Sequence, residues 1–337
     1  MHKVYTYEEI KNDSKKFEEV FLFIKKFGSH TMAYSILQPK MYYFISDLGL
    51  VAYAKYKTKR KRCYILADPL CYEKNLKELL ESFLKINPKS TFVQVSEKTA
   101  KILNNLKYFA TPMGIETTIK LEKFDINGER KKKLRNNIRN CKKELTILED
   151  NELSEININE LKKISENWLK EKKKTKKEIN FLTRPFVTDK EIDVRKFYAI
   201  KDNKIVGFMV FNPVYFEEKL IGYTADITRI LDNAPRGSGD YILYLALKKF
   251  KREGHPLLSL GLSPFADLHK DKLGLHNKST LRLLKYIYNK GEKLYHFQGL
   301  DSHKKQFEGK EHHVYFSHKK RFPIYQIYQL FKICNVI

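Results

Sequence analysis

The sequence is poor in the residues that build disulfide frameworks and zinc sites. Its 337 residues include four cysteines, none in C-x-x-C spacing: Cys63, Cys71, Cys141 and Cys334. Scattered cysteines of this kind are typical of reduced thiols in the cytoplasm. The first residues, MHKVYTYEEIKNDSKK, also lack the apolar core of a signal peptide. We therefore expect a cytoplasmic protein without a disulfide frame.

Long apolar runs are missing as well. No stretch approaches the roughly eighteen uncharged apolar residues that a membrane span needs. Any work at a membrane is therefore expected at its surface, as peripheral contact with the inner face. The tail FPIYQIYQLFKICNVI combines apolar residues with few charges. It fits a helix docked on its own domain, and a membrane-surface anchor is the alternative.

Acidic residues are scarce relative to basic ones, with 40 Asp and Glu against 65 Lys and Arg, which gives a net charge of +25. This excess favours a polyanionic partner, nucleic acid or an anionic membrane, unless it reflects a lysine-rich proteome. The charge is clustered, which favours a partner. Residues 128–144, GERKKKLRNNIRNCKKE, place Leu134, Ile138 and Cys141 on one stripe of a helix and basic residues on the rest. A second basic block, KEKKKTKK, covers 170–177.

Two interpretations of the basic helix stay open. It is either a solvated linker or a ridge that follows RNA phosphates. Few aromatic residues interleave the basic ones, so contact with the backbone of a folded RNA is favoured over stacking on single bases. On this second interpretation the contacting residues are Lys131, Lys132, Lys133, Arg135, Arg139, Lys142 and Lys143.

The apolar pattern predicts a mixed α/β fold. Hydrophobic residues make up 42% of the chain, enough for a substantial core. Strands are expected within 42–57, 62–70, 91–96, 114–124, 219–227, 257–265 and 313–319, and FYAIKDNKIVGFMVF predicts a hairpin with Asp202 and Asn203 at its turn. Helical spacing marks 21–27, 75–86 and 240–252, and the segment around ISENWLKEK. Two units of similar order suggest a structural duplication.

The stretch DITRILDNAPRGSGDY, residues 226–241, lies where a predicted strand gives way to a helix. Ser238 or Asp240 is predicted to cap that helix. The glycines permit close backbone approach, and free N–H groups at a helix start attract phosphate or another anion. A capped helix start that binds nothing is the alternative.

Longer segments resemble a known family. GYTADITRILDNAPRGSGDYILYLAL, LLSLGLSPFADL and LYHFQGLDSHKKQF look like the catalytic domain of the phosphatidylglycerol lysyltransferases, the multiple peptide resistance factor family. That family shows G-Y-x-x-D-x-x-R, a Gly-Ser/Thr step opening a helix, a Leu-Gly-x-x-Pro turn, and F-x-G-L followed by lysines. ILADPL, FVQV, ISENWLKEK and GIETTIKLEKFDINGERKKKLRNNIRN agree with it too, so the resemblance covers about 25–320. APRGSG is also similar to the pyrophosphate loop of the GNAT acetyltransferase fold.

The resemblance implies a fold and an activity. The fold is two tandem GNAT-like domains, 1–127 and 146–337, joined by a basic linker helix over 128–145, with the second domain catalytic. The activity is transfer of an amino acid, lysine or another, from aminoacyl-tRNA as co-substrate to an acceptor such as phosphatidylglycerol or a small molecule, without a cofactor. The alternatives are an acyl-CoA-dependent N-acyltransferase and a non-catalytic module that binds tRNA or membrane.

The resemblance also suggests roles for single residues. The protonated α-amine of an aminoacyl ester needs a carboxylate, and Asp226 is the candidate, with Glu116 and Asp240 as alternatives. Arg229 is expected to hold a phosphate or the terminal adenosine, although a structural salt bridge of Asp226 and Arg229 is an alternative. Ser238 is expected to belong to the catalytic set with Asp226 and Arg229. Gly237 and Ser238 are expected to bind phosphate, and Gly261 and Ser263 to stabilise the developing oxyanion. Lys304 and Lys305 are expected to bind an acceptor phosphate or the tRNA end.

Because of departures from the family pattern, the acceptor can be the lipid or, instead, a small molecule or another amine. The segment 307–311 lacks the proline and tryptophan that usually follow F-x-G-L, and FLTRPF carries Arg184 and Pro185 where the family has glycine. Histidines gather at 303–318, but this lysine-rich stretch lacks the fixed spacing of a zinc site, so we expect no metal.

Overall fold

The computed structural model describes residues 2–56, 62–152, 158–172, 178–291 and 297–336. The strands are β1 (His2–Thr6), β2 (Met41–Ser46), β3 (Gly49–Tyr56), β4 (Arg62–Leu66), β5 (Leu70–Cys71), β6 (Ser90–Val95), β7 (Phe109–Lys120), β8 (Thr146–Glu149), β9 (Arg195–Lys201), β10 (Lys204–Phe216), β11 (Lys219–Ile230), β12 (Leu257–Pro264) and β13 (Lys310–His318). The helices are α1 (Tyr7–Asn12), α2 (Ser14–Phe27), α3 (Leu76–Ile86), α4 (Glu97–Asn105), α5 (Lys132–Cys141), α6 (Ile158–Lys172), α7 (Ser238–Arg252), α8 (Lys278–Lys290), α9 (Phe297–Lys305) and α10 (Ile324–Ile333). The elements expected from the apolar patterns are therefore present.

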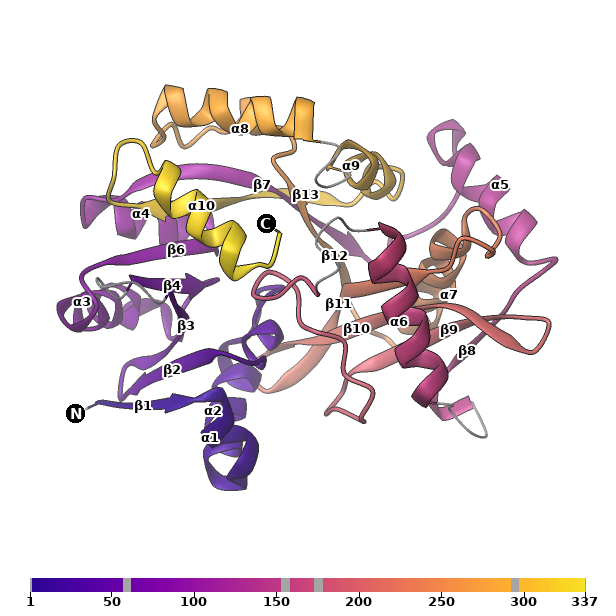
Figure 1. Ribbon diagram of the computed structural model, residues 1–337, viewed down its shortest axis with the longest axis horizontal. Helices are drawn as coiled ribbons and strands as arrows, with labels where there is room; N and C mark the ends of the chain where they lie inside the picture. Colours follow the sequence, from indigo (N-terminus) through magenta and orange to yellow (C-terminus); the bar gives the residue numbers. More distant parts are fainter. Residues whose placement is uncertain (1, 57–61, 153–157, 173–177, 292–296, 337) are drawn as a thin grey trace.

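The strands form one mixed sheet that runs through both parts of the chain (Figure 1). Its order is β1-β2-β3-β4-β6-β13-β7-β12-β11-β10-β9-β8, with β5 paired to β3. Two neighbouring pairs are parallel, β4 with β6 and β11 with β12. Each parallel pair is connected through a helix, α3 in the first part and α7 in the second, as parallel strands require. The mixed α/β class is confirmed, and the two units do repeat this arrangement.

The end of the chain returns to the first part. Strand β13 lies between β6 and β7, and Ile327 and Leu330 of α10 belong to the same apolar core as Met41 and Tyr64. The tail is thus a helix docked on its own protein, as one of the two interpretations expected. The division into domains 1–127 and 146–337 stays a prediction, and residues 310–333 pack with the first of them.

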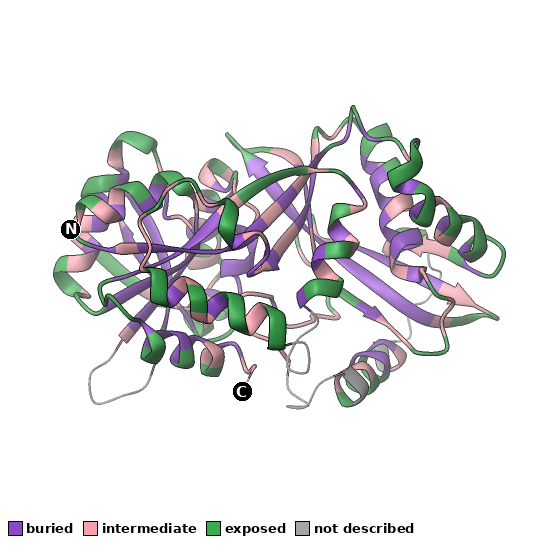
Figure 2. Cartoon of the chain, turned by 90° about the horizontal axis from the view of Figure 1, so that it is seen from above, coloured by how far each residue is buried: buried purple, intermediate pink, exposed green. Residues whose placement is uncertain are grey.

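Helices cover both faces of the sheet, and the strands between them are buried (Figure 2). In the first part, Phe44 and Tyr53 pack with α3 and α4, whereas Tyr43 and Tyr64 face α2 and α10. This alternation follows the period of two along a strand. In the second part α5 and α7 cover one face and α6 the other. The predicted hairpin is confirmed, and its turn residues Asp202 and Asn203 have φ of 48° and 60°.

Candidate functional site

A cavity of about 390 Å³ opens where strands β11 and β12 separate. The parallel pairing of the two strands ends at Thr224 and Ser259. Past that point both strands line the cavity together with residues of α6, α8, α9 and α10. The wall is mainly apolar and carries a few polar side chains: Ser35, Gln94, Thr183, Thr224, Asp226, Thr228, Arg229, His303 and Lys304. A cavity of this size and lining is typical of a small-molecule site.

Asp226 is the extra residue of a β-bulge at this wall. The β10–β11 register passes from Val210–Ile227 to Phe211–Ala225 and so skips it. Bulges often re-aim a side chain next to a functional site. The Asn212 Nδ2 group donates a hydrogen bond of 2.8 Å to Asp226 Oδ2. Burial raises the pKa of Asp226 to about 6, although Arg184 and Asn212 oppose the shift.

Arg229 follows on the same strand and also lines the cavity. Its side chain is buried, and its guanidinium carbon lies 4.0 Å from the ring centroid of Trp168 on α6. Its Nη2 also forms an ion pair with Glu178. Arg229 is therefore held by an aromatic face and a carboxylate, which orients its guanidinium.

Lys304 reaches the same cavity from α9 and is only 7% exposed. Its Nζ donates a hydrogen bond of 2.7 Å to the Leu262 carbonyl. Gly261 lies beside it, because a Cβ atom built on that glycine would be 3.9 Å from Lys304 Nζ. Burial lowers the pKa of Lys304 to about 7, and the nearby carboxylates of Glu116 and Asp301 oppose the shift. An amine of this kind can exchange a proton near neutral pH.

Glu116 lies on β7 behind the cavity wall. It accepts hydrogen bonds from Gln94 Nε2 at 2.6 Å and from Thr31 Oγ1 at 2.8 Å. Burial raises its pKa, and these two hydrogen bonds oppose the shift. Glu116 therefore acts on the cavity through Gln94 and Lys304, whereas Asp226 lines it directly.

The irregular part of β12, where its register with β7 shifts between Ser259 and Leu262, departs from the expected oxyanion site. Gly261 has φ of 67°, and its N–H already donates to Ser259 Oγ at 3.0 Å. Ser263 is 1% exposed, and its Oγ has no hydrogen-bond partner within the described part of the chain. The Gly261 N–H is thus not an open donor.

The two neighbouring lysines point to different places. Lys304 lines the cavity, whereas Lys305 forms ion pairs with Asp301 at 2.8 Å and with Asp267 at 3.2 Å. Burial would lower the pKa of Lys305, but these carboxylates raise it above its usual value. Lys305 therefore holds α9 to the turn after β12.

The helix start at α7 corrects the expected capping. Gly237 is the N-cap, in the left-handed conformation with φ of 94°, and no side chain caps the helix. Ser238 is buried and its hydroxyl donates to the Pro235 carbonyl. A Cβ atom on Gly237 would lie 2.6 Å from Asn137 Cβ, so this glycine permits the close approach of α5 to α7.

A second cavity of about 500 Å³ lies over this loop. It is lined by Gly237, Ser238 and Gly239, and it shares Trp168 and Thr228 with the first cavity. The predicted phosphate-binding loop thus borders a space that adjoins the candidate site.

Asp240 does not line either cavity but joins three helices. It accepts hydrogen bonds from Asn137 Nδ2 at 2.6 Å and Gln306 Nε2 at 2.8 Å, and it lies 2.9 Å from His303 Nδ1. Burial would raise the pKa of Asp240, but these partners hold it below its usual value. Asp240 therefore stabilises the packing of α7 against α5 and α9.

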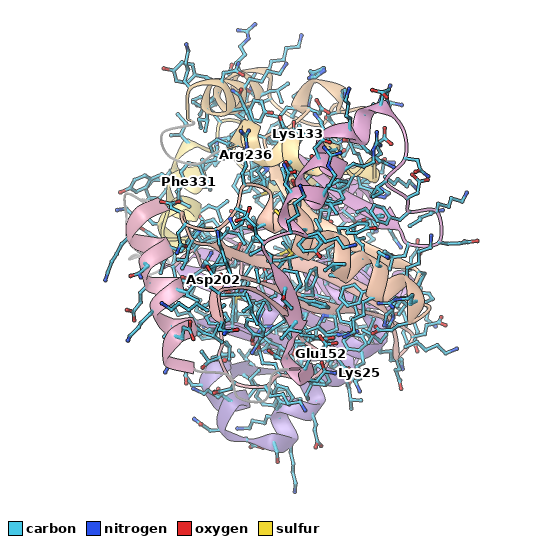
Figure 3. The ribbon with its side chains drawn as sticks, turned by 90° about the vertical axis from the view of Figure 1, so that its right-hand side faces the viewer. Lys25, Lys133, Glu152, Asp202, Arg236 and Phe331 are labelled. Carbon is cyan, nitrogen blue, oxygen red and sulfur yellow. The ribbon has the colours of Figure 1, made fainter. Side chains whose placement is uncertain are left out.

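The basic helix is seated as expected. Leu134, Ile138 and Cys141 of α5 are buried. Two of its predicted RNA-binding residues are engaged within the chain: Lys131 is buried and its Nζ donates to the Asp125 carbonyl, and Arg135 donates to the Ile126 and Gly128 carbonyls. The exposed ones are Lys132, Lys133, Arg139, Lys142 and Lys143. Lys133 and Arg236 lie on the same side of the molecule (Figure 3).

Some residues at the site were not predicted as site residues. Trp168 and Gln94 lie in ISENWLKEK and FVQV, two segments that carry the family resemblance, and Asn212 lies on β10. Only the fold brings these side chains to the candidate site. Arg184 lies where the family pattern has glycine. It donates to Asn212 Oδ1 at 3.2 Å and pairs with Glu191, so it supports the partner of Asp226.

The described residues hold neither a metal-ligand cluster nor a helix that could span a membrane. In the described ranges no cluster of three histidine, cysteine or acidic residues could hold a metal ion. Within those same ranges, no helix has the length and apolar character needed to cross a membrane. Most of the second basic block lies at 173–177, outside the described residues.

Known structures are similar to this chain along nearly its whole length. The structure of L-PGS from Bacillus licheniformis superposes with a TM-score of 0.76 at 21% identity, over 94% of this chain and 96% of that one. The C-terminal domain of a putative lysylphosphatidylglycerol synthetase from Agrobacterium fabrum gives 0.74 at 20% identity, over 95% of both chains. FemX gives 0.56 at 12% identity, over 93% and 98%. These similarities concern the fold.

Sequence comparison agrees with the fold. The phosphatidylglycerol lysyltransferase of Bacillus subtilis (strain 168) is 25% identical over 311 residues, which cover 90% of this chain and 35% of that protein. The enzyme of the same name from Staphylococcus aureus (strain COL) is 22% identical over 303 residues, covering 87% and 34%. The chain thus spans about a third of the length of these curated relatives. A family model described as phosphatidylglycerol lysyltransferase, C-terminal, matches residues 21–318, and the chain belongs to that family.

Proposed function

We propose that the chain is an aminoacyltransferase that moves an amino acid from aminoacyl-tRNA to a hydroxyl or amine acceptor. The observation that carries the proposal is the cavity between β11 and β12, whose wall holds the carboxylate of Asp226 and the amine of Lys304. Family membership supports it, since the relatives are named phosphatidylglycerol lysyltransferases. The acceptor is phosphatidylglycerol or a small molecule, and lysine is one candidate for the transferred amino acid.

The donor requires a site for its ammonium group. An aminoacyl ester carries a protonated α-amine next to the reacting carbonyl, and a carboxylate in a partly buried wall is its natural partner. Asp226 supplies that carboxylate, and Asn212 holds it in place. Arg229 is held between Trp168 and Glu178, from where it orients the phosphate or ribose at the end of the tRNA.

The reaction then needs one proton transfer. The acceptor oxygen or nitrogen attacks the ester carbonyl carbon, a new ester or amide bond forms, and the bond to the terminal ribose oxygen breaks. Neutral Lys304 takes the proton that the acceptor loses and returns it to the leaving ribose oxygen. Because the ester is already activated, positioning in the cavity supplies much of the rate.

The tRNA body is proposed to lie along α5. Five exposed cations remain there after Lys131 and Arg135 are set aside, and they adjoin the loop at the start of α7, which borders the second cavity. Phosphates following this ridge would bring the aminoacyl end toward Trp168, which lines both cavities.

Charge reversal on the ridge should weaken tRNA binding. The triple variant carries Lys132→Glu, Lys133→Glu and Arg139→Glu. The affinity for tRNA falls as salt is added, and each lost phosphate contact should make the plot of log K against log salt less steep by about one unit. The fold should survive, because the buried stripe of α5 is untouched. Filter binding across a salt series measures both effects.

The matched control reverses three exposed lysines on the other part of the molecule, Lys77, Lys85 and Lys89. It has the same change in net charge and should bind tRNA more tightly than the ridge variant. Equal losses of tRNA affinity in both variants would mean that binding depends only on the net charge of the protein. The proposal that tRNA lies along α5 would then be wrong.

A transfer assay tests the function itself. Mixed labelled aminoacyl-tRNAs are incubated with the protein and either a phospholipid extract or a set of small amines, and labelled product is separated from tRNA. We expect the unchanged protein to transfer label to one acceptor class. The Asp226→Asn variant should transfer much less label to the same acceptor. Thermal protection by coenzyme A, with none by aminoacyl-tRNA, would point instead to an acyl-CoA-dependent enzyme. Binding of tRNA without any transfer would point to a non-catalytic module.

A further inference from the structure

Helix α10 and the turn just before it expose large apolar side chains. Phe322, Ile324, Tyr325 and Tyr328 are 47%, 50%, 52% and 46% exposed. Within α10, positions 324, 325, 328 and 332 lie within about 100° of one another around the helix axis, so they share one face. The exposed side chains of residues 319–332 are called the α10 surface below.

The α10 surface is also basic. Residues 319–332, KKRFPIYQIYQLFK, contain four cations and no acid. The cations lie among the aromatic rings: Arg62 of β4 lies 5.6 Å from the ring centroid of Tyr325, and Lys332 lies 5.7 Å from that of Tyr328. Aromatic rings mixed with Lys and Arg are the pattern of a membrane–water interface, where anionic headgroups complement the cations.

The opposite face of the same helix lines the cavity. Ile327, Leu330 and Phe331 belong to the cavity wall, and α10 lies on the outside of the sheet (Figure 1). Only one helix, about 10 Å thick, therefore separates the apolar part of the cavity from the α10 surface.

We propose that the α10 surface docks on an anionic phospholipid membrane. The rings of Phe322, Tyr325 and Tyr328 then lie at headgroup level, and the cations at 319–321 contact lipid phosphates. A second copy of the chain is a poor occupant, since a two-fold contact would bring these cations against themselves. RNA would match the cations but leave Phe322 and Ile324 without an apolar partner.

Vesicle binding tests this docking without any transfer reaction. The full chain is sedimented with phosphatidylcholine vesicles, with or without a minor fraction of phosphatidylserine, whose headgroup is not the proposed acceptor. We expect binding to the anionic vesicles, weakened by salt. Phe322→Ser, Tyr325→Ser and Tyr328→Ser together should lower the partition coefficient at least about tenfold. Lys319→Gln, Lys320→Gln and Arg321→Gln together should lower it about a hundredfold, at about 1 kcal/mol for each cation.

The control variant carries Leu22→Ser, Ile86→Ser and Phe216→Ser, which are equally exposed at 57%, 50% and 51% but lie elsewhere. It should bind vesicles like the unchanged chain, and melting temperatures confirm that all variants fold. Failure of the unchanged chain to bind, or equal losses in the control, would overturn the proposal. A change in oligomeric state or in tRNA affinity, with vesicle binding intact, would assign the surface to a second copy or to RNA. Because no aminoacyl-tRNA is used, this result is separate from that of the transfer assay.

Discussion

Asp226→Asn is expected to lower kcat/KM for aminoacyl transfer at least about thirtyfold. The change keeps the shape of the side chain and removes its charge. If the carboxylate meets the α-ammonium in a partly desolvated cavity, its loss costs on the order of 2–5 kcal/mol of binding and positioning energy, and about 1.4 kcal/mol is tenfold in rate. Transfer rates measured at aminoacyl-tRNA concentrations well below saturation give kcat/KM for both proteins.

The same variant should not lose stability. Burial raises the pKa of Asp226 from its usual value of 3.8 to about 6. Between pH 3.8 and about pH 6, the folded state therefore binds more protons than the unfolded state. The charge of Asp226 therefore costs stability above that window, at neutral pH. An asparagine carries no such charge and can still accept the hydrogen bond from Asn212. We expect a melting temperature equal to or above that of the unchanged protein.

Asp240→Asn is the matched comparison. Its partners hold the pKa of Asp240 below the usual value, so this carboxylate contributes stability above its unfolded pKa, and that contribution is lost as the pH falls through its folded pKa. This variant should melt earlier and lose much less turnover per folded molecule. The reverse pattern, with Asp226→Asn unstable but active and Asp240→Asn stable but inactive, would move the ammonium site to α7.

The fold was largely predictable because its apolar spacing is regular. Leu76, Leu79, Leu80 and Phe83 are all buried on one face of α3, as their spacing requires. The position of β13 was not predictable in the same way. Its insertion between β6 and β7 depends on pairing with residues more than 190 positions earlier in the sequence, which no local pattern records.

The roles of the candidate site residues stay predictions, and which of these residues line the cavity depends on packing. Lys304 and Lys305 are adjacent and chemically alike in sequence, yet only the rotation of α9 decides which one enters the cavity. Likewise, Lys131 and Lys132 are neighbours of the same charge in the sequence and were predicted to bind RNA together. In the structure, Lys131 lies in the turn before α5 and is buried. Capping by Ser238 was wrong because the left-handed Gly237 starts α7 and turns the Ser238 hydroxyl to Pro235.

Replacing Lys304 by methionine should have the largest effect on turnover, a loss of about a hundredfold or more. Methionine keeps the length and apolar stem of the side chain and removes the amine. A positioned base is worth about 10²–10⁴ in rate, and Lys304 is the amine that lines the cavity next to Gly261. Tight binding of aminoacyl-tRNA should persist, so the loss should fall on kcat.

The pH profile fixes the form of Lys304 that acts. Burial lowers its pKa to about 7, so the neutral amine becomes the major form as the pH rises through 7. If Lys304 is the base, kcat rises with pH across this point, and Lys304→Arg stays inactive because arginine remains charged. If activity instead falls above about 7 and Lys304→Arg restores it, the lysine acts as a cation that stabilises the developing oxyanion.

Stability supplies an independent check on the same residue. The folded pKa of about 7 lies below the unfolded value of 10.5, so the unfolded state binds more protons between these two values. Protonated Lys304 thus costs stability below about 7, and the cost is relieved as the pH rises toward 10.5. Lys304→Met should therefore melt about 2 °C or more above the unchanged protein at neutral pH, with an advantage that shrinks in alkaline buffer. A variant that is both inactive and less stable at pH 7 would mean that Lys304 holds α9 in place through the Leu262 carbonyl and does not take part in proton transfer.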